Sequence, residues 1–260
     1  MANAKKYEDL TFTDDFMFCK VMTTNPELCH ELLELILGKK VGAFTRLDQQ
    51  KPIEMTADGK GIRFDVYSED DSKTVYDCEM QTSRKDNLPK RTRYYQGMID
   101  LNLLERGANY KELKKSYVIF ICPFDEFKRG LHKYTFENRC KEMPELVLGD
   151  ESTKIFLCAG GNADDVSDDM KDFLNWLTTE KIGDSELVKK LQNAVENAQN
   201  QFHLGKMIMM YRRIVLLVKR KRSTLKLIHM SIWVILQWPY PIQPLQKLLL
   251  SKTNMMVGIW

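Results

Sequence analysis

Alternating apolar and polar residues over 61–68 and 74–82 form the clearest periodic pattern along the chain. Alternation with a period of two is typical of strands, because successive side chains point to opposite faces of a sheet. The acidic and polar segment 69–73 between the two stretches has the composition of a turn. The pattern therefore predicts an antiparallel β-hairpin.

Helical periodicity is found on both sides of this hairpin. One helix is expected after residues 10–15, with Thr13 as its cap, and a second from Pro26 to a stop at Gly38. The rest of the pattern predicts a helix over 90–106, a strand at 116–122 covered on both faces, short strands at 133–137 and 154–159, and helices over 167–177 and 185–200. The order ααββαβββαα indicates a mixed α/β sandwich.

Parity assigns a face to each side chain of the hairpin. The first strand would present Ile62, Phe64 and Val66 on one face and Arg63, Asp65 and Tyr67 on the other; the second strand would present Tyr76, Cys78 and Met80 on an apolar face and Asp77, Glu79 and Gln81 on a polar one. A turn centred on Ser72 places Asp65 opposite Glu79, with Gln81 next on the same face.

Two opposed carboxylates repel each other unless a cation lies between them. Mg²⁺ and Mn²⁺ prefer carboxylate and water oxygens and are often bound by one or two carboxylates together with substrate phosphate. Such an ion activates water for attack on phosphorus, so Asp65 and Glu79 predict phosphodiester hydrolysis as the reaction. The alternative at this point is an ordinary polar strand face turned to solvent.

Composition changes this picture at one end of the chain. Residues 197–260 contain ten Lys or Arg and no Asp or Glu, whereas residues 1–196 contain the other 29 basic residues and all 36 acidic ones. A basic amphipathic helix is expected over 211–222, an apolar stretch covers 227–238, and prolines interrupt 239–244. This tail differs in kind from the body of the chain.

Several classes of protein are excluded by the remaining composition. No stretch approaches the roughly 18 apolar residues of a membrane span, and the first residues lack the apolar run of a signal peptide. We therefore expect a cytoplasmic protein without a membrane partner, with association of the basic, apolar tail with an anionic membrane surface as a weaker alternative. The six cysteines lie far apart and the four histidines are scattered, so we expect reduced thiols, no zinc finger and no catalytic histidine.

Five short motifs, in this order, resemble a bacterial family. They are residues 10–18 (LTFTDDFMF), Asp65 followed by Glu79 and Gln81, residues 88–100 (LPKRTRYYQGMID), residues 154–157 (KIFL) and residues 166–174 (VSDDMKDFL). Together they resemble the recombination-promoting nuclease (Rpn-type), or transposase, family of the PD-(D/E)XK nuclease superfamily, over about residues 8–200. The resemblance implies a restriction-endonuclease-like fold, with a mixed β-sheet flanked by α-helices, that cuts DNA with Mg²⁺.

The same resemblance assigns roles to individual residues. Asp65 and Glu79 would be catalytic metal ligands, and Gln81 would stand where the superfamily has a lysine, which leaves the supply of positive charge open. Asp15 is a further acidic candidate, with helix capping as the alternative. On the helix after the hairpin, Arg93 and Gln96 share a face with Arg91 at its margin; they are candidates to bind a phosphate or orient water, the alternative being a surface helix.

Two interpretations remain for the tail, and two remain for the function of the protein. Residues after about 200 are either a frameshifted, possibly disordered segment or a basic arm that binds DNA phosphates; the domain assignment is therefore 1–200 for the nuclease-like domain and 201–260 for the tail. The expected function is a metal-dependent DNA endonuclease of recombination or transposition, with a homodimer open because duplex cutting often needs two active sites. The alternative is a weak or inactive nuclease fold that binds nucleic acid or a partner protein.

Overall fold

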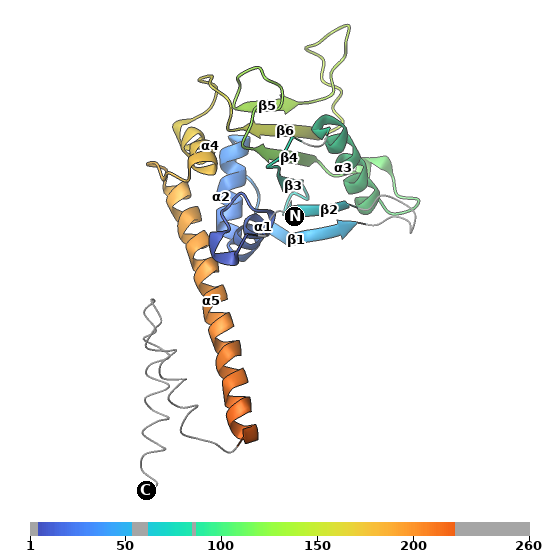
Figure 1. Ribbon diagram of the computed structural model, residues 1–260. Helices are drawn as coiled ribbons and strands as arrows, with labels where there is room; N and C mark the ends of the chain where they lie inside the picture. Colours follow the sequence, from blue (N-terminus) through green and yellow to red (C-terminus); the bar gives the residue numbers. More distant parts are fainter. Residues whose placement is uncertain (1–4, 54–61, 85–86, 222–260) are drawn as a thin grey trace. The chain divides into compact units, whose positions relative to one another are not determined.

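A mixed sheet with helices on both faces organises the protein (Figure 1). The computed structural model describes residues 5–53, 62–84 and 87–221. Within these residues, a six-stranded sheet has the order β1-β2-β3-β4-β6-β5. The predicted mixed sheet flanked by helices is confirmed.

The strands run in two groups. The antiparallel group comprises β1 (Phe44–Ile53), β2 (Ile62–Asp70) and β3 (Val75–Met80), and the parallel group joins β3 to β4 (Ser116–Cys122) and β6 (Ser152–Cys158), with β5 (Lys133–Phe136) antiparallel at the far edge. Strand β4 lies in the middle of the sheet and is buried along its whole length, as its continuous apolar sequence predicts. The carboxyl ends of β3, β4 and β6 therefore lie at the same edge of the sheet.

The helices cover the two faces unequally. They are α1 (Asp15–Thr24), α2 (Pro26–Leu37), α3 (Leu88–Leu103), α4 (Asp168–Thr179) and α5 (Glu186–Lys221), with single 3₁₀ turns at Tyr7–Asp9 and Tyr110–Glu112. One apolar cluster joins α1, α2, α4 and the first part of α5 to one face of the sheet, and a second joins α3 to the other (Figure 1). Both faces of β3 are consequently covered.

Strand β1 was missed by the sequence pattern. Its sequence, FTRLDQQKPI, has few apolar residues and contains Pro52, which lacks the N–H that a central strand donates. Because β1 is an edge strand, it needs neither two apolar faces nor a full set of backbone hydrogen bonds. The observed order of helices and strands is ααβββαβββαα, one strand more than predicted.

Helix boundaries differ from the predictions at three places. The residue that precedes α1 is Asp14 rather than Thr13, and its carboxylate accepts a hydrogen bond from Thr11 N–H instead of capping the helix. Helix α3 ends at Leu103, before Gly107, because Leu104 already has an extended backbone. Helix α5 continues to Lys221, so residues 211–221 of the separate helix expected over 211–222 form the end of one long helix, and residue 222 lies outside the described residues.

The chain divides into two compact units, residues 1–202 and 203–260. The described part of the second unit, 203–221, is helical, and the apolar and proline-rich segments expected after it lie outside the described residues. In the described part of the chain, no helix is both long enough and apolar enough to cross a membrane. All six cysteines are free thiols, and five of them are buried.

Candidate active site

The register of β2 and β3 is the one predicted from the turn. Val66 pairs with Cys78 and Tyr67 with Asp77. Continuing this register by one residue brings Asp65 opposite Glu79. At this point side-chain hydrogen bonds replace the backbone hydrogen bonds between the strands. Asp65 N–H donates to Glu79 Oε1 at 2.9 Å, and Met80 N–H donates to Asp65 Oδ2 at 3.1 Å. Each carboxylate thus binds the backbone of the opposite strand.

The prediction that successive side chains of β2 alternate strictly between the two faces of the sheet is wrong at Asp65. Ile62 and Phe64 pack in the α3 cluster together with Tyr67, whereas Val66 packs in the cluster of α1 and α2. Strict alternation would have put Phe64 and Val66 on the same face. The break falls at Asp65, where side-chain hydrogen bonds replace the regular ladder. On β3 the predicted alternation holds, with Tyr76, Cys78 and Met80 together in the cluster of α1 and α2.

The acidic face of β3 is buried, so the alternative of a solvated strand face is wrong. Glu79 is 1% exposed, Asp65 is 8% exposed and Asp77 is fully buried. Burial raises the pKa of Asp65 to about 6, and the nearby charge of Asp15 acts in the same direction. Burial and the charge of Asp65 raise the pKa of Glu79 to about 8. Removing these carboxylates from water makes their ionised forms costly unless a positive charge is close.

Asp77 is a third acidic residue of this cluster, and it was not among the predicted site residues. Burial, followed by the charges of Glu79 and Asp65, raises its pKa well above the ordinary value. Both of its oxygens are buried without a donor among the described residues. Asp77 can form a hydrogen bond with the carboxyl group of Glu79. Such a bond between two carboxyl groups requires that one of them is protonated. Its position two residues before Glu79 on the same face was the available signal.

Arg91 of α3 binds both polar residues of the Glu79-x-Gln81 motif. Its Nη2 lies 2.8 Å from Glu79 Oε2 and its Nη1 lies 2.6 Å from Gln81 Oε1. The guanidinium also donates to the Tyr95 hydroxyl and lies over the rings of Tyr95 and Phe120. Contacts of this kind fix the orientation of the guanidinium plane. A permanent positive charge therefore lies beside Gln81.

A hollow of about 580 Å³ opens beside the two carboxylates. Its lining includes Asp65, Gln81 and Arg91, together with Asp15 from the start of α1 and Arg63 from β2. The structure thus brings Asp15, Asp65, Gln81 and Arg91 to one opening, with Glu79 directly behind them through its contacts with Asp65 and Arg91. Arg63 was not among the predicted site residues, since one basic residue on a strand carries no distinctive signal.

Two residues of the predicted set lie elsewhere. Arg93 is exposed on α3 and does not line the hollow. Gln96 is buried and donates to Ser116 Oγ at 2.7 Å and to Asp100 at 3.0 Å, near the beginning of β4 rather than the carboxyl end of β3. The face of α3 that meets the site is the one that carries Arg91 and, four residues later, Tyr95.

The residues present fit a hard divalent cation, although they do not form a complete metal cage. Within the described ranges, no group of three or more His, Cys, Asp and Glu side chains is arranged to hold a metal ion by itself. Mg²⁺ commonly takes only one or two protein carboxylates and completes its shell with water and substrate phosphate. Asp65 and Glu79 supply two carboxylates at the edge of a polar hollow, where a cation would offset their shared charge.

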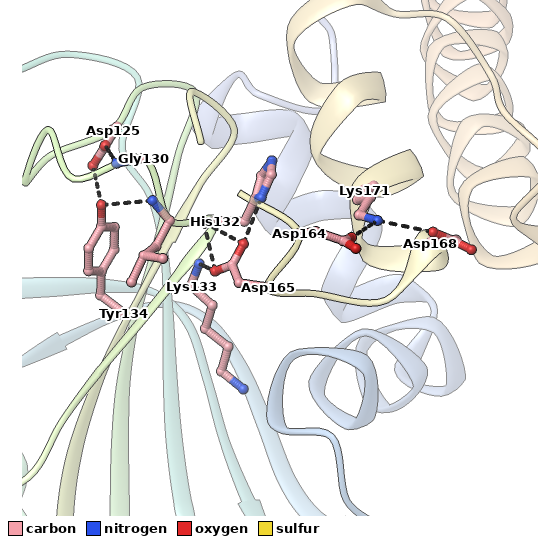
Figure 2. A network of polar contacts seen from close by, with 10 residues as sticks. Asp125, Gly130, His132, Lys133, Tyr134, Asp164, Asp165, Asp168 and Lys171 are labelled. Atoms are coloured by element: carbon pink, nitrogen blue, oxygen red, sulfur yellow. Dashed lines mark hydrogen bonds and ion pairs between the residues drawn. The ribbon is translucent and has the colours of Figure 1, made fainter. Parts of the chain in front are cut away.

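The loops that follow β4 and β6, at the same edge of the sheet as the site, are held by carboxylates (Figure 2). Asp125 accepts hydrogen bonds from the N–H groups of Phe127 and Gly130 and from the Tyr134 hydroxyl. Arg84, just after the hollow, donates to the carbonyl of Asp125 at 3.2 Å. Arg84 therefore links the segment that follows β3 to the loop that Asp125 holds.

One comparison with known proteins identifies a related family. The model of a family described as PD-(D/E)XK nuclease family transposase matches residues 12–209. The matched segment contains Asp15, Asp65, Glu79, Gln81 and Arg91, and its mixed sheet is consistent with a restriction-endonuclease-like fold. No curated protein and no solved structure matches the chain.

Proposed function

The chain belongs to the PD-(D/E)XK nuclease family transposases, and on that basis we propose that it is a divalent-metal-dependent DNA endonuclease acting in recombination or transposition in the cytoplasm. The observation that carries this proposal is the meeting of Asp65 and Glu79 across β2 and β3, each bound to the backbone of the other strand. Carboxylates held in this way keep their positions when a substrate enters.

Asp65 and Glu79 are the residues that would hold Mg²⁺ or Mn²⁺. When bound, such an ion offsets negative charge on the phosphate and lowers the pKa of a water molecule. The part of the protein is to fix the two carboxylates, through Asp65 N–H and Met80 N–H, and to keep them in a largely dry setting where electrostatic interactions are strong. Asp15, at the mouth of the hollow, is a further candidate ligand.

Arg91 supplies the positive charge that Gln81 cannot. Gln81 contributes a carbonyl oxygen that accepts from Arg91 Nη1, so the amide holds the guanidinium in place. An arginine in this position donates several hydrogen bonds in one plane and matches the geometry of a phosphate. The departure from the superfamily lysine is thus consistent with catalysis, with the cation provided by α3 instead of β3.

Plasmid cleavage tests the proposed function. Purified protein is expected to nick or cut supercoiled plasmid with Mg²⁺ or Mn²⁺ and not in EDTA. Asp65→Asn and Glu79→Gln, which keep the side-chain shapes, should each reduce cleavage to the level without metal. The matched control is Asp164→Asn, which removes an exposed carboxylate in the loop after β6. Asp164 pairs with Lys171 of α4, and the variant should cleave normally. Cleavage by both site variants at the wild-type rate would exclude this function.

One observation favours a second candidate, binding of nucleic acid without turnover. Both oxygens of Glu79 already accept hydrogen bonds, from Asp65 N–H and from Arg91 Nη2. If these bonds persist with substrate present, Glu79 contributes little to a metal. Calorimetric titration with Mn²⁺ separates the two functions: binding that is lost in Asp65→Asn supports the nuclease, whereas tight DNA binding without Mn²⁺ binding or cleavage supports the alternative.

A further inference from the structure

A second hollow lies next to the candidate site, between the end of α1 and the edge strand β1. Its volume is about 560 Å³, and it is lined by Lys20, Thr23, Thr24, Arg46, Leu47, Asp48, Gln49, Lys51 and Pro52. Pro52 also lines the hollow that contains Asp65 and Arg91. The two hollows are therefore neighbours along β1.

Positive charge dominates this second hollow. Three basic side chains face a single acidic one, Asp48, which pairs with Arg46. The Nζ of Lys51 is buried and lies 3.6 Å from the centre of the Tyr67 ring, so it is not exposed to a ligand in the hollow. Lys20 makes no ion pair with any described residue. The unpaired Lys20 and the nearby Arg46 favour binding of an anion beside a site that handles phosphates.

The register of β1 and β2 aligns this positive charge with the catalytic residues. Pro52 pairs with Arg63 and Lys51 with Phe64, the two residues that precede Asp65. From Pro52 back to Arg46 the strand extends about 20 Å, at roughly 3.3 Å per residue. This length corresponds to about six nucleotides of a duplex, which rises about 3.4 Å per nucleotide along each strand. A nucleic-acid strand with one phosphate beside Asp65 would thus pass along the basic hollow.

We propose that the hollow lined by Lys20 and Arg46 is a subsite for the sugar-phosphate backbone of DNA that flanks the bond to be cut. This inference rests on the proposed nuclease function and extends it to the substrate. Lys20 contacts a phosphate, and Arg46 exchanges Asp48 for a phosphate oxygen. The Thr23 and Thr24 hydroxyls, at the end of α1, are polar groups that suit backbone contacts without reading the bases.

Binding measured without metal tests the subsite apart from catalysis. A fluorescently labelled duplex of about 20 base pairs is titrated with protein in EDTA at several salt concentrations. Lys20→Gln and Arg46→Gln should each weaken binding several-fold and reduce the slope of log affinity against log salt by about 1. Lys111→Gln removes the same charge from the exposed 3₁₀ turn before β4 and should change neither quantity. Lys20 is partly exposed and Arg46 is exposed, so neither substitution disturbs the core.

A second arm compares substrates of different length. Bis(p-nitrophenyl) phosphate is too small to reach from Asp65 to Arg46, so Lys20→Gln should hydrolyse it with unchanged kcat and KM, while KM for the long duplex rises. Wild-type affinity and salt dependence in both variants, or an equal loss in Lys111→Gln, would overturn the subsite. If the binding results are as expected but neither substrate is hydrolysed, the subsite stands and the nuclease function fails.

Discussion

Arg91 contacts both Glu79 and Gln81 through its guanidinium group. If its charge stabilises the phosphate during cleavage, Arg91→Met should lower plasmid cleavage by roughly 10²–10³-fold, the usual effect of losing one such donor. Gln81→Lys added to Arg91→Met restores a cation at the superfamily position and should recover part of the rate. The rates are measured with saturating Mn²⁺.

Arg93→Met is the matched control, because Arg93 lies two residues along the same helix but is exposed and outside the hollow. It should cleave like the wild type. If the double variant unfolds normally but cleaves no faster than Arg91→Met, a lysine at position 81 cannot replace the charge of Arg91.

Asp77 is held in a state that a carboxylate does not favour. It is fully buried, both oxygens lack a donor among the described residues, and burial raises its pKa. Asp77→Asn keeps the shape, removes the charge and provides an N–H for Glu79. We expect the metal-free variant to be more stable at pH 8 by roughly 1–3 kcal/mol, the cost of an unsatisfied buried polar group. Urea denaturation measures the difference, and a less stable variant would contradict it.

The sequence identified the acidic pair but not its surroundings. Asp65 and Glu79 could be paired from the turn length, because the hairpin is local, although the alternation of faces along β2 breaks at Asp65. Arg91 could not be preferred over Arg93, since which face of α3 meets the sheet depends on packing by Tyr95 and other residues of the α3 cluster. Asp77 was placed on the right face but not recognised, because sequence patterns assume that a polar strand face is solvated.

Among the elements, those with strong local patterns were predicted well. The hairpin, the buried strand β4 and the helix α2, with Pro26 at its start and Gly38 in the left-handed conformation at its end, all follow from residues next to one another. Strand β1 was missed because its own sequence has little strand character and it is held in place by pairing with β2. The basic hollow was missed for the same reason, as it is formed between α1 and β1.

The loop between β4 and β5 gives a prediction that depends on pH. Burial tends to raise the pKa of Asp125, but hydrogen bonds from Gly130 N–H, the Tyr134 hydroxyl and Phe127 N–H hold it below its ordinary value (Figure 2). A lowered pKa in the folded state means that the ionised group stabilises the fold above the unfolded pKa. This contribution is lost as the pH falls through the folded pKa.

Asp125→Asn should therefore be less stable than the wild type at pH 7, by about 1.5–3 kcal/mol for the loss of charge-assisted hydrogen bonds. The difference should shrink as the pH is lowered below the ordinary value of 3.8. Urea denaturation at a series of pH values between 7 and 3 measures it. Asp168→Asn, at an exposed carboxylate that pairs with Lys171 and not with the Asp125 loop (Figure 2), is the control and should show a smaller difference. A difference that is constant with pH would show that the charge of Asp125 is not responsible.

At the scale of the whole molecule, charge and structure divide the chain at nearly the same place. Acidic residues stop at Glu196, the first compact unit ends at Phe202, and the family match continues to residue 209. Both apolar clusters consist of residues within the first unit, as do all the residues of the candidate site. We therefore expect the first unit to be sufficient for the fold and the site.

Truncation after Met210 should leave the unfolding temperature and the rate of plasmid cleavage unchanged, because it keeps Phe202, whose ring stacks on Tyr7, and two further turns of α5. It removes nine of the ten basic residues of the tail. If that tail is a DNA-binding arm, affinity for duplex will fall and its salt dependence will become less steep, since each phosphate contact contributes to the slope. If the tail is translated from a shifted reading frame and has no function, both quantities will stay at the wild-type value. A truncated protein that fails to unfold cooperatively would show instead that residues 211–260 support the fold.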